Sequence, residues 1–409
     1  MTIPDPRVTS YELKKIPVAQ ICAALEETAK RFLNPQSPWR HRAIFETAAQ
    51  AGFTEPMIRQ ALDWTFSEMT AGRLLQLVVA ELGSAGAPDD ESMRSPSLVF
   101  LTAAGAIFQP AIYGIACALL VKSPILVKCS SHERQMIPLF VECLRDVTDD
   151  IGQAAQAGYW PGQDRDDLWA KADAFLAFGS DETISDIRAR ISVGTIFIGH
   201  GHKISVAVVG QGSLNSISDA QGTAKRLAID IAMYDQSGCL SPQNVWIETG
   251  GRVGPGQFAG MLSEELAGLA GTLPPGPFGV GQAAAISAFR SEYEFRSAAG
   301  HGACRCFFGD RLSYTVIVDP DPSFCPSPLG RTILVKPIDR ISEWAGCLTS
   351  IAGHVQGIGA APMADFREVF RDCRNLGASY FCEIGRMQRP PITWQNGGIP
   401  CLRSLLKVS

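Results

Sequence analysis

From residue 98 onward the sequence alternates short apolar runs with stretches of helical periodicity, and this pattern narrows the possible folds more than any other feature. Strands and helices that alternate in this way form a parallel sheet covered by helices on both faces. We therefore predict an α/β fold. The predicted strands are 98–103, 124–128, 174–178, 195–198, 205–209, 244–248, 315–318 and 332–335, and the predicted helices among them are 109–120, 132–147, 181–192 and 223–234.

The size and composition of the chain indicate two large, well-packed domains. A chain of 409 residues is long for a single hydrophobic core, and a hydrophobic content of 46% with 19% charged residues is typical of a globular protein. Residues 10–80 are predicted to form helices, with patterns at 18–32, 41–51 and 55–70. A mainly helical N-terminal part should thus precede the alternating region.

The charged residues and the cysteines indicate which binding partners and which cellular compartment to expect. The 36 Lys and Arg residues form no basic cluster beside the 41 Asp and Glu residues, so we expect no nucleic-acid partner. The twelve cysteines lack the paired spacing of secreted scaffolds, and the N-terminus lacks the basic and apolar regions of a signal peptide. Together these features predict a reduced, cytoplasmic protein.

One uncharged stretch, residues 97–121, is long enough to cross a bilayer. It is interrupted by Gly105, Pro110 and Gly114, and it begins with the pattern of a buried strand. A strand, a turn and a buried helix account for it, so we predict no membrane span.

Cys239 lies in a loop between a predicted helix and a predicted strand, which should present its thiol at the end of an element. Gly238 allows a bulky substrate to approach, and Pro242 restricts the loop backbone. A thiolate in this setting is the nucleophile that thioester chemistry requires. The alternative is a buried structural cysteine, because most cysteines behave as small hydrophobic residues.

Two glycine-containing segments are candidates for phosphate binding. Residues 279–284 match the pattern G-x-G-x-x-A, but no strand precedes them, so we interpret them as a loop followed by a helix start. Gly179 and Ser180 follow a predicted strand and directly precede a predicted helix. Because the N-terminus of a helix offers unpaired N–H groups, this second segment is the better anion site.

Residues 301–306 (HGACRC) contain metal-binding residue types. A C-x-C pair with one histidine supplies too few ligands for a closed zinc site, and alternating residues of a half-buried strand explain the pattern. We therefore expect no metal.

Four ordered motifs give the chain a family resemblance over about residues 95–400: 118–123 with 126–128, 205–210, 237–243 and 385–394. The chain resembles the aldehyde dehydrogenase superfamily and, within it, the LuxC-type acyl-CoA reductases. This resemblance implies an aldehyde-dehydrogenase-like fold with a Rossmann-like cofactor domain, an α/β catalytic domain, and the thiol of Cys239 in the cleft between them. On this basis we predict an NADP-binding domain at 1–236, with a mainly helical part at 1–95. A catalytic domain would follow at 237–380, with a C-terminal segment at 381–409 packing back on the body.

The resemblance also implies which residues contact the cofactor. Lys128 corresponds to the lysine that contacts the adenosine ribose. Gly179 and Ser180 correspond to the pyrophosphate contact, and Thr183 lies one turn later in the helix. Ser130, in the loop after Lys128, belongs to the same predicted site.

The preferred cofactor is predicted from Ser131. Relatives that prefer NAD have an acid at this position, which holds the ribose hydroxyls, whereas a serine can hydrogen-bond a 2′-phosphate beside Lys128. NADPH is therefore favoured, although the nearby Glu133 keeps NADH possible.

Several positions depart from the hydrolytic members of the superfamily. The segment that carries their water-activating glutamate corresponds to residues 199–203 (GHGHK), so an acyl-cysteine should survive for thiol exchange or reduction. His200 or His202 could relay a proton, and a structural role is equally open. The asparagine with which those relatives help to hold the oxyanion corresponds to Ala106 here. Their glutamate at the nicotinamide ribose corresponds to a position near Ser327. Their acid near the C-terminal tryptophan is replaced by Asn-Gly-Gly at 396–398.

We therefore predict that the chain uses NADPH to reduce an acyl thioester, carried by CoA or a carrier protein, to an aldehyde through an acyl-cysteine at Cys239. A partner acyltransferase or synthetase and a homo-oligomer are also expected. One alternative is a CoA-acylating aldehyde dehydrogenase or an acyltransferase. Another, suggested by Ala106, Ser327 and Asn396, is a degenerate subunit that binds the nucleotide or a partner without catalysis.

Overall fold

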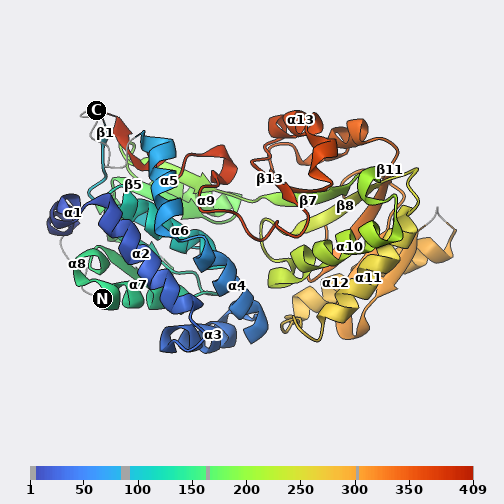
Figure 1. The fold of residues 1–409 in the computed structure, drawn as a ribbon, viewed down its shortest axis with the longest axis horizontal. Helices are drawn as coiled ribbons and strands as arrows, with labels where there is room; N and C mark the ends of the chain where they lie inside the picture. Colours follow the sequence, from blue (N-terminus) through green and yellow to red (C-terminus); the bar gives the residue numbers. More distant parts are fainter. Residues whose placement is uncertain (1–5, 84–92, 163–165, 301–303, 409) are drawn as a thin grey trace. The chain divides into compact units, whose positions relative to one another are not determined.

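A computed structural model describes residues 6–83, 93–162, 166–300 and 304–408 (Figure 1). The chain forms two compact units: unit 1 contains residues 1–202 and 391–409, and unit 2 contains residues 203–390. Each unit has its own parallel or largely parallel sheet. The α/β fold predicted from the alternating pattern is confirmed.

Unit 1 is built on a five-stranded parallel sheet with the order β4-β3-β2-β5-β6. The chain starts at β2, adds β3 and β4 on one side, and then returns to add β5 and β6 on the other side. This reversal creates a topological switch point between β2 and β5, where open α/β sheets bind ligands. The strands are β2 (Val99–Thr102), β3 (Ile125–Lys128), β4 (Ala155–Gly158), β5 (Ala174–Phe178) and β6 (Ile196–His200).

The connections in this sheet run through α6 (Gln109–Leu120), α7 (Met136–Val147), α8 (Asp149–Gly152), η1 (Asp166–Lys171) and α9 (Asp181–Arg190). Helix α6 is buried along nearly its whole length, which explains why residues 97–121 lack charge. In the part of the chain that the structure describes, no helix is both long and apolar enough to cross a membrane.

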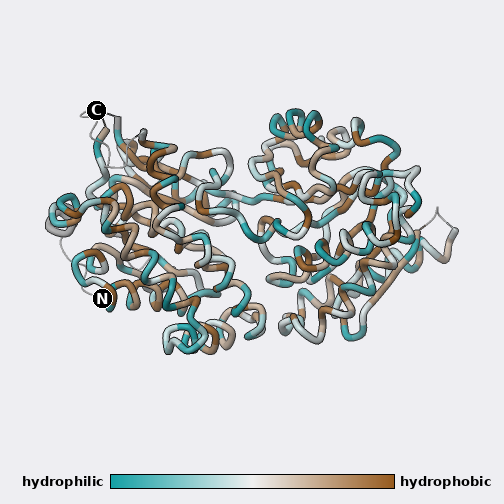
Figure 2. The backbone as a smooth tube through the Cα atoms, in the orientation of Figure 1, coloured by the Kyte–Doolittle hydropathy of each residue, from teal (hydrophilic) through white to brown (hydrophobic). Residues whose placement is uncertain are grey.

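The N-terminal part of unit 1 is helical, as its periodicity predicts. Its helices are α1 (Pro6–Lys15), α2 (Val18–Leu33), α3 (Pro38–Ala51), α4 (Glu55–Ser67) and α5 (Ala71–Leu82). Helix α2 packs against its neighbours and against α6 and α7. Near its C-terminal end, the ring of Phe32 stacks on that of Phe66 of α4, with centroids 4.7 Å apart, and Phe140 of α7 lies beside them. Hydropathy varies along each helix, as expected where one side covers a core (Figure 2).

Unit 2 contains a seven-stranded sheet with the order β13-β12-β7-β8-β11-β10-β9, parallel except for β9. Its strands are β7 (Ile204–Val209), β8 (Pro242–Glu248), β9 (Arg305–Phe308), β10 (Thr315–Val318), β11 (Thr332–Ile338), β12 (Val355–Ala361) and β13 (Tyr380–Glu383). Its helices are η2 (Gln211–Ser213), α10 (Ile217–Ala232), η3 (Met233–Gln236), α11 (Pro255–Leu269), α12 (Val280–Ala298), η4 (Asp310–Leu312), η5 (Ile341–Ile351), η6 (Met363–Phe366) and α13 (Val369–Asn375).

The core of unit 2 combines aromatic packing with a buried ion pair. Trp246 and Trp344 meet edge to face, with ring centroids 5.9 Å apart. On β11, the Lys336 ammonium is completely buried and lies 2.7 Å from Asp319 Oδ2, which also accepts a 3.0 Å hydrogen bond from Tyr293. Removing one partner of such a pair would leave an uncompensated charge in the core.

The boundary between the units differs from the one predicted between residues 236 and 237. Strand β7 and helix α10 belong to unit 2, because β7 pairs with β8 and β12. The C-terminal residues 391–409, with η7 (Asn396–Gly398) and η8 (Arg403–Leu405), belong to unit 1. There the Cys401 N–H donates to Glu81 Oε1 at 2.8 Å, and β14 (Lys407–Val408) pairs with β1 (Met93–Arg94).

Candidate functional site

All six residues predicted to contact a cofactor line one cavity of 540 Å³ in unit 1. A volume of this size is typical of sites for small molecules and cofactors. The cavity is formed by the segments that follow β2, β3, β4 and β5, so it lies at the carboxyl ends of the parallel strands, on both sides of the switch point. The six residues are Lys128, Ser130, Ser131, Gly179, Ser180 and Thr183.

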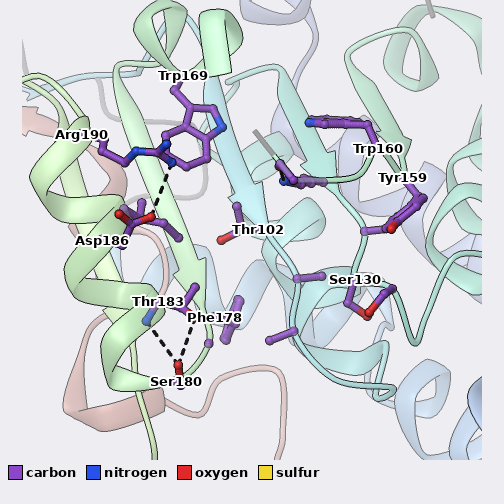
Figure 3. A pocket seen from close by; sticks show the side chains of 18 residues that line it. Thr102, Ser130, Tyr159, Trp160, Trp169, Phe178, Ser180, Thr183, Asp186 and Arg190 are labelled. Carbon is purple, nitrogen blue, oxygen red and sulfur yellow. Dashed lines mark hydrogen bonds and ion pairs between the residues drawn. The ribbon is translucent and has the colours of Figure 1, made fainter. Parts of the chain in front are cut away.

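The turn from β5 into α9 forms one wall of the cavity (Figure 3). Ser180 is the N-cap of α9, and its Oγ accepts a hydrogen bond from the Thr183 N–H at 3.2 Å and lies 3.0 Å from Thr183 Oγ1. A Cβ at Gly179 would lie 3.0 Å from Thr183 Cβ, so a larger residue there would crowd the turn. The first-turn N–H groups of α9 favour an anionic group.

Aromatic side chains form the other surfaces of the cavity. Tyr159 and Trp160 lie on one side, and Trp169 lies on the other beside Arg190 (Figure 3). The Arg190 guanidinium is 5.3 Å from the Trp169 ring, and its Nη1 is 3.5 Å from Asp186 Oδ2. Flat apolar rings of this kind suit a planar base.

None of these aromatic residues was predicted from the sequence, because no periodic pattern marks them. One available signal was position: Tyr159 and Trp160 directly follow the carboxyl end of β4. The strand itself has the sequence AQAG, which lacks the large apolar residues that identify the other strands, and it was not predicted either.

Two buried polar atoms in the cavity wall test whether a cofactor fits. Thr102 and Trp169 are 8% and 7% exposed, and within the described residues neither Thr102 Oγ1 nor Trp169 Nε1 has a hydrogen-bond partner. Leaving a buried donor or acceptor unpaired costs about 1–3 kcal/mol. A ligand with polar groups would relieve this cost, so the residues present fit a nucleotide-type cofactor.

The last residue of β3, Lys128, and the loop that follows it form the positively charged end of the cavity. Lys128 Nζ donates to the Gly162 carbonyl at 2.5 Å, and Ser131 Oγ lies 3.1 Å from His132 Nδ1. Ser130 Oγ accepts N–H groups from His132 and Glu133 at 3.1 and 3.0 Å, so this hydroxyl also stabilises the turn.

Glu133, whose position near Ser131 left NADH possible as the cofactor, has a structural role instead. It is 1% exposed, and its Oε1 accepts hydrogen bonds from the backbone N–H groups of Gln135 (2.9 Å) and Met136 (2.5 Å) at the start of α7. Burial raises the pKa of this carboxyl, and these hydrogen bonds oppose the rise. Glu133 does not line the cavity. Its capping role also explains why α7 begins at Met136 instead of at residue 132.

Cys239 is exposed in unit 2, in the loop that leads from α10 and η3 into β8. The loop crosses the amino ends of the strands: Ser205 Oγ, at the start of β7, donates to the Cys239 carbonyl at 2.6 Å and accepts the Gly357 N–H at 3.0 Å. A Cβ at Gly357 would lie 2.8 Å from both Ser205 Oγ and Leu240 Cδ2, so a larger residue there would displace these side chains. The predicted position of the thiol at an element end is confirmed.

The surroundings of Cys239 determine the resting protonation state of its thiol. Although Cys239 is exposed, desolvation by the surrounding protein raises the pKa of its thiol to about 11, and a backbone hydrogen bond opposes this only in part. No cationic side chain among the described residues is one of the causes of this shift. The thiol is therefore protonated at pH 7, and deprotonation must accompany its attack on a substrate.

The raised pKa predicts how the reactivity of Cys239 depends on pH. Because only the thiolate is alkylated, and its fraction rises with pH until the pKa is reached, labelling by iodoacetamide should accelerate about tenfold per pH unit from pH 7 to pH 9. The measurement is peptide mass spectrometry of the protein without cofactor. A labelling rate that stops rising by pH 8 would contradict the prediction, because it would show a stabilised thiolate.

The segment 199–203 lies at the end of β6. The His200 ring stacks on Phe178, with centroids 4.8 Å apart, and the His202 N–H donates to Asp181 Oδ1 at 2.8 Å. A Cβ at Gly201 would lie 2.1 Å from the same oxygen, so a larger residue there would displace the Asp181 carboxylate. These contacts favour a structural role for the segment, and a proton relay through His200 or His202 stays a prediction.

The other candidate positions add little to the site. Ser327 stabilises a turn, because its Oγ donates to Thr332 O at 2.6 Å and accepts the Leu329 N–H at 3.0 Å. His301 lies outside the described residues, whereas residues 305–308 form β9, as predicted. Among the described residues, no group of three or more His, Cys, Asp and Glu side chains could hold a metal ion. The predicted role of Ala106 is not tested.

The fold of the chain is similar to the folds of solved aldehyde dehydrogenases. It is similar to a putative aldehyde dehydrogenase from Anabaena variabilis, with a TM-score of 0.66, 13% identity, and coverage of 100% of this chain and 95% of the other. An NAD-dependent benzaldehyde dehydrogenase from Corynebacterium glutamicum gives a TM-score of 0.67 and 12% identity, over 98% and 86% of the two chains. At these identities the similarity establishes the fold alone.

The family model for acyl-CoA reductase (LuxC) matches residues 13–408, so the chain belongs to this family of oxidoreductases. The long-chain acyl-protein thioester reductase of Aliivibrio fischeri is 25% identical over 79% of this chain and 68% of the relative. The corresponding protein of Photobacterium phosphoreum is 23% identical over 71% and 60%. The chain thus spans about two thirds of these relatives. The family and the fold imply a nicotinamide cofactor.

Proposed function

We propose that the chain reduces an acyl thioester to an aldehyde with NADPH, using Cys239 as the nucleophile. The main support is that all six predicted cofactor residues line one cavity at the switch point of the unit 1 sheet, in a chain of the acyl-CoA reductase family. The exposed thiol on a fixed loop of unit 2 supplies the second requirement. Incubation with acyl-CoAs of graded chain length, followed by NADPH absorbance, tests the proposal.

In the proposed reaction, Cys239 Sγ attacks the carbonyl carbon of the thioester and the bond from that carbon to the carrier thiol breaks. The proton of the Cys239 thiol passes to the departing thiolate, which leaves an acyl-cysteine. The nicotinamide cofactor, when bound, supplies the hydride that reduces this acyl group. Release of the aldehyde regenerates Cys239. The hydrogen bond from Ser205 to the Cys239 carbonyl holds the backbone of the nucleophile during these steps.

Three features support NADPH over NADH. Ser131 is neutral, Lys128 supplies a positive charge in the same cavity, and Glu133 is buried at the start of α7, away from the cavity lining. An anionic 2′-phosphate would therefore meet a basic and hydrogen-bonding surface. Lys128, Ser130, Ser131, Gly179, Ser180 and Thr183 would hold the cofactor, together with the aromatic walls.

The physiological substrate is proposed to be an acyl group on CoA or on a carrier or enzyme thiol. The support is that the similar proteins of A. fischeri and P. phosphoreum are named long-chain acyl-protein thioester reductases. We also propose that a partner acyltransferase or synthetase presents the acyl group and that the chain forms a homo-oligomer.

A CoA-acylating aldehyde dehydrogenase would use the same residues in the opposite direction, and the segment 199–203 favours acyl transfer to a thiol over hydrolysis. Because this segment contains no carboxylate to activate water, aldehyde with NADP⁺ should yield acyl-CoA when CoA is present and little free acid without it. Chromatography of the acyl products measures this partition. Rapid acid formation without CoA would contradict the prediction. NADPH binding with neither product would favour the non-catalytic subunit.

A further inference from the structure

Two short segments of unit 2 share an unusual backbone conformation. Residues 234–236, just before the Cys239 loop, have φ values of 55°, 46° and 65°, and residues 329–331, just before β11, have φ values of 64°, 64° and 59°. Five of these six residues are not glycine, and side chains disfavour the left-handed region. Conformations of this kind persist only where the surrounding structure holds them, and they cluster at functional sites.

The two segments hold each other through a set of buried contacts. Asp235 Oδ1 lies 2.7 Å from Arg331 Nε, and the Asp235 carbonyl accepts the Gly330 N–H at 3.2 Å. The Gln236 amide bonds both backbone groups of Thr332: it donates to the carbonyl at 2.8 Å and accepts the N–H at 2.8 Å. Their exposed fractions are 6% for Asp235, 0% for Gln236, 1% for Arg331 and 0% for Thr332.

Gln236 also bridges the base of the Cys239 loop. Its Nε2 donates to the Pro242 carbonyl at 2.7 Å, so one side chain connects the residue three positions before the cysteine with the residue three positions after it. On the far side of the loop, Gln388 Nε2 donates to Ser241 Oγ at 3.1 Å. The ends of the loop are thus fixed by side chains, while Cys239 itself stays exposed.

We propose that Gln236 and the Asp235–Arg331 pair are positioning residues that set the direction of the Cys239 thiol. The left-handed segment turns the chain sharply out of α10, and the Gln236 amide holds that turn against β11. If this amide is lost, residues 234–236 are free to return to ordinary φ values, and the loop that carries the thiol reorients. The inference rests on the proposed role of Cys239 as the nucleophile.

The experiment compares two reactions of Cys239 in the full-length chain. Acyl loading is followed by intact-protein mass spectrometry after mixing with palmitoyl-CoA without cofactor, and iodoacetamide labelling is followed at the Cys239 peptide. In Gln236→Ala, loading should slow by about 10²-fold, because a misplaced nucleophile loses its alignment with the carbonyl. Labelling, which needs no alignment, should be faster than in wild type, because the loop no longer holds the thiol in one direction. NADPH affinity should not change.

Two further variants keep the test decisive. Arg331→Lys preserves the charge but not the planar guanidinium, so it should slow loading by a smaller factor, and it replaces Gln236→Ala if that variant does not fold. Lys336→Met is the matched control, because it breaks the buried pair with Asp319 in the same unit. It should lower the unfolding temperature and leave loading at the wild-type rate below that temperature.

Loading within threefold of wild type in Gln236→Ala, or an equal loss in Lys336→Met, would overturn the inference. So would a parallel loss of loading and labelling in Gln236→Ala. If Cys239→Ala loads as fast as wild type, the proposed function fails instead. Labelling of Cys239 then tests the positioning role of Gln236 by itself. Faster labelling in Gln236→Ala supports that role, and an unchanged rate overturns it.

Discussion

Replacing Cys239 with alanine is expected to abolish acyl loading and to reduce thioester reduction by about 10⁴–10⁶-fold, as the removal of a catalytic nucleophile does elsewhere. The reason is structural. Cys239 is exposed on a loop that Ser205 and Gln236 hold in place, and the acyl-cysteine is the intermediate on which the proposed reaction depends. A mass-tagged acyl thioester, added without NADPH, measures loading directly.

Cys325 is a suitable control for this experiment. It is partly exposed in the same unit, where the Tyr293 hydroxyl lies 3.9 Å from its sulfur. Cys325→Ala should load acyl groups at the wild-type rate. Cys239→Ser should fold normally because the change in volume is small, and it should lack the thiol nucleophile. Equal loading of wild type and Cys239→Ala would place the nucleophile at another of the twelve cysteines.

Replacing Ser131 with aspartate is expected to reverse the preference for NADPH and to change the ratio of NADPH to NADH efficiency by about 10²–10³-fold. Ser131 lines the cavity beside Lys128, so a carboxylate there would face a 2′-phosphate at short range. Two unit charges about 4 Å apart interact by about 4 kcal/mol at an effective dielectric constant of 20, and each 1.4 kcal/mol changes the ratio tenfold. Initial rates with each cofactor over a range of concentrations give the ratio.

Ser131→Ala separates charge from shape in this test. It removes the hydroxyl without adding a charge, so it should weaken the preference only modestly, by the loss of one hydrogen bond. Glu133→Gln should leave the preference close to that of wild type, because Glu133 caps α7 and does not line the cavity. If wild type uses both cofactors equally and Ser131→Asp changes nothing, the proposed role of Ser131 is wrong.

The raised pKa of Cys239 adds a constraint to the proposed mechanism. A thiol with a pKa of about 11 is mostly protonated at pH 7, so its attack requires that the proton be transferred to another group. In the proposed mechanism the departing carrier thiolate is one acceptor, and the absence of a carboxylate in residues 199–203 would keep water from competing for the acyl group. A protonated resting thiol also protects an exposed cysteine from unwanted alkylation and oxidation.

Local patterns predicted many elements well. Helix α6 and strand β5 have the predicted bounds, and Gly179 and Ser180 lie at a strand end before a helix, as expected. The element type depends on the spacing of apolar residues along the chain, and this information is present in each segment itself. The same holds for the position of Cys239 between a helical pattern and a strand.

Predictions failed where contacts between distant residues decide the structure. The predicted domain boundary after residue 236 placed β7 in the first domain, whereas its hydrogen bonds with β8 and β12 place it in unit 2. The helical pattern at 223–234 predicted neither the end of α10 at Ala232 nor the left-handed φ values of residues 234–236. The bonds to Thr332 and Arg331 override local preference there, and those partners lie almost one hundred residues away in the chain.

The sequence by itself thus determined the α/β class, most of the elements and, through a family resemblance, the candidate residues. The tertiary structure alone decided that six of these residues share a cavity with Thr102 and Trp169, that Glu133 caps a helix, and that desolvation raises the pKa of the Cys239 thiol. The physical reason is that periodicity and capping are local properties of the chain. Burial, pKa and the shape of a cavity depend on atoms that only folding brings together.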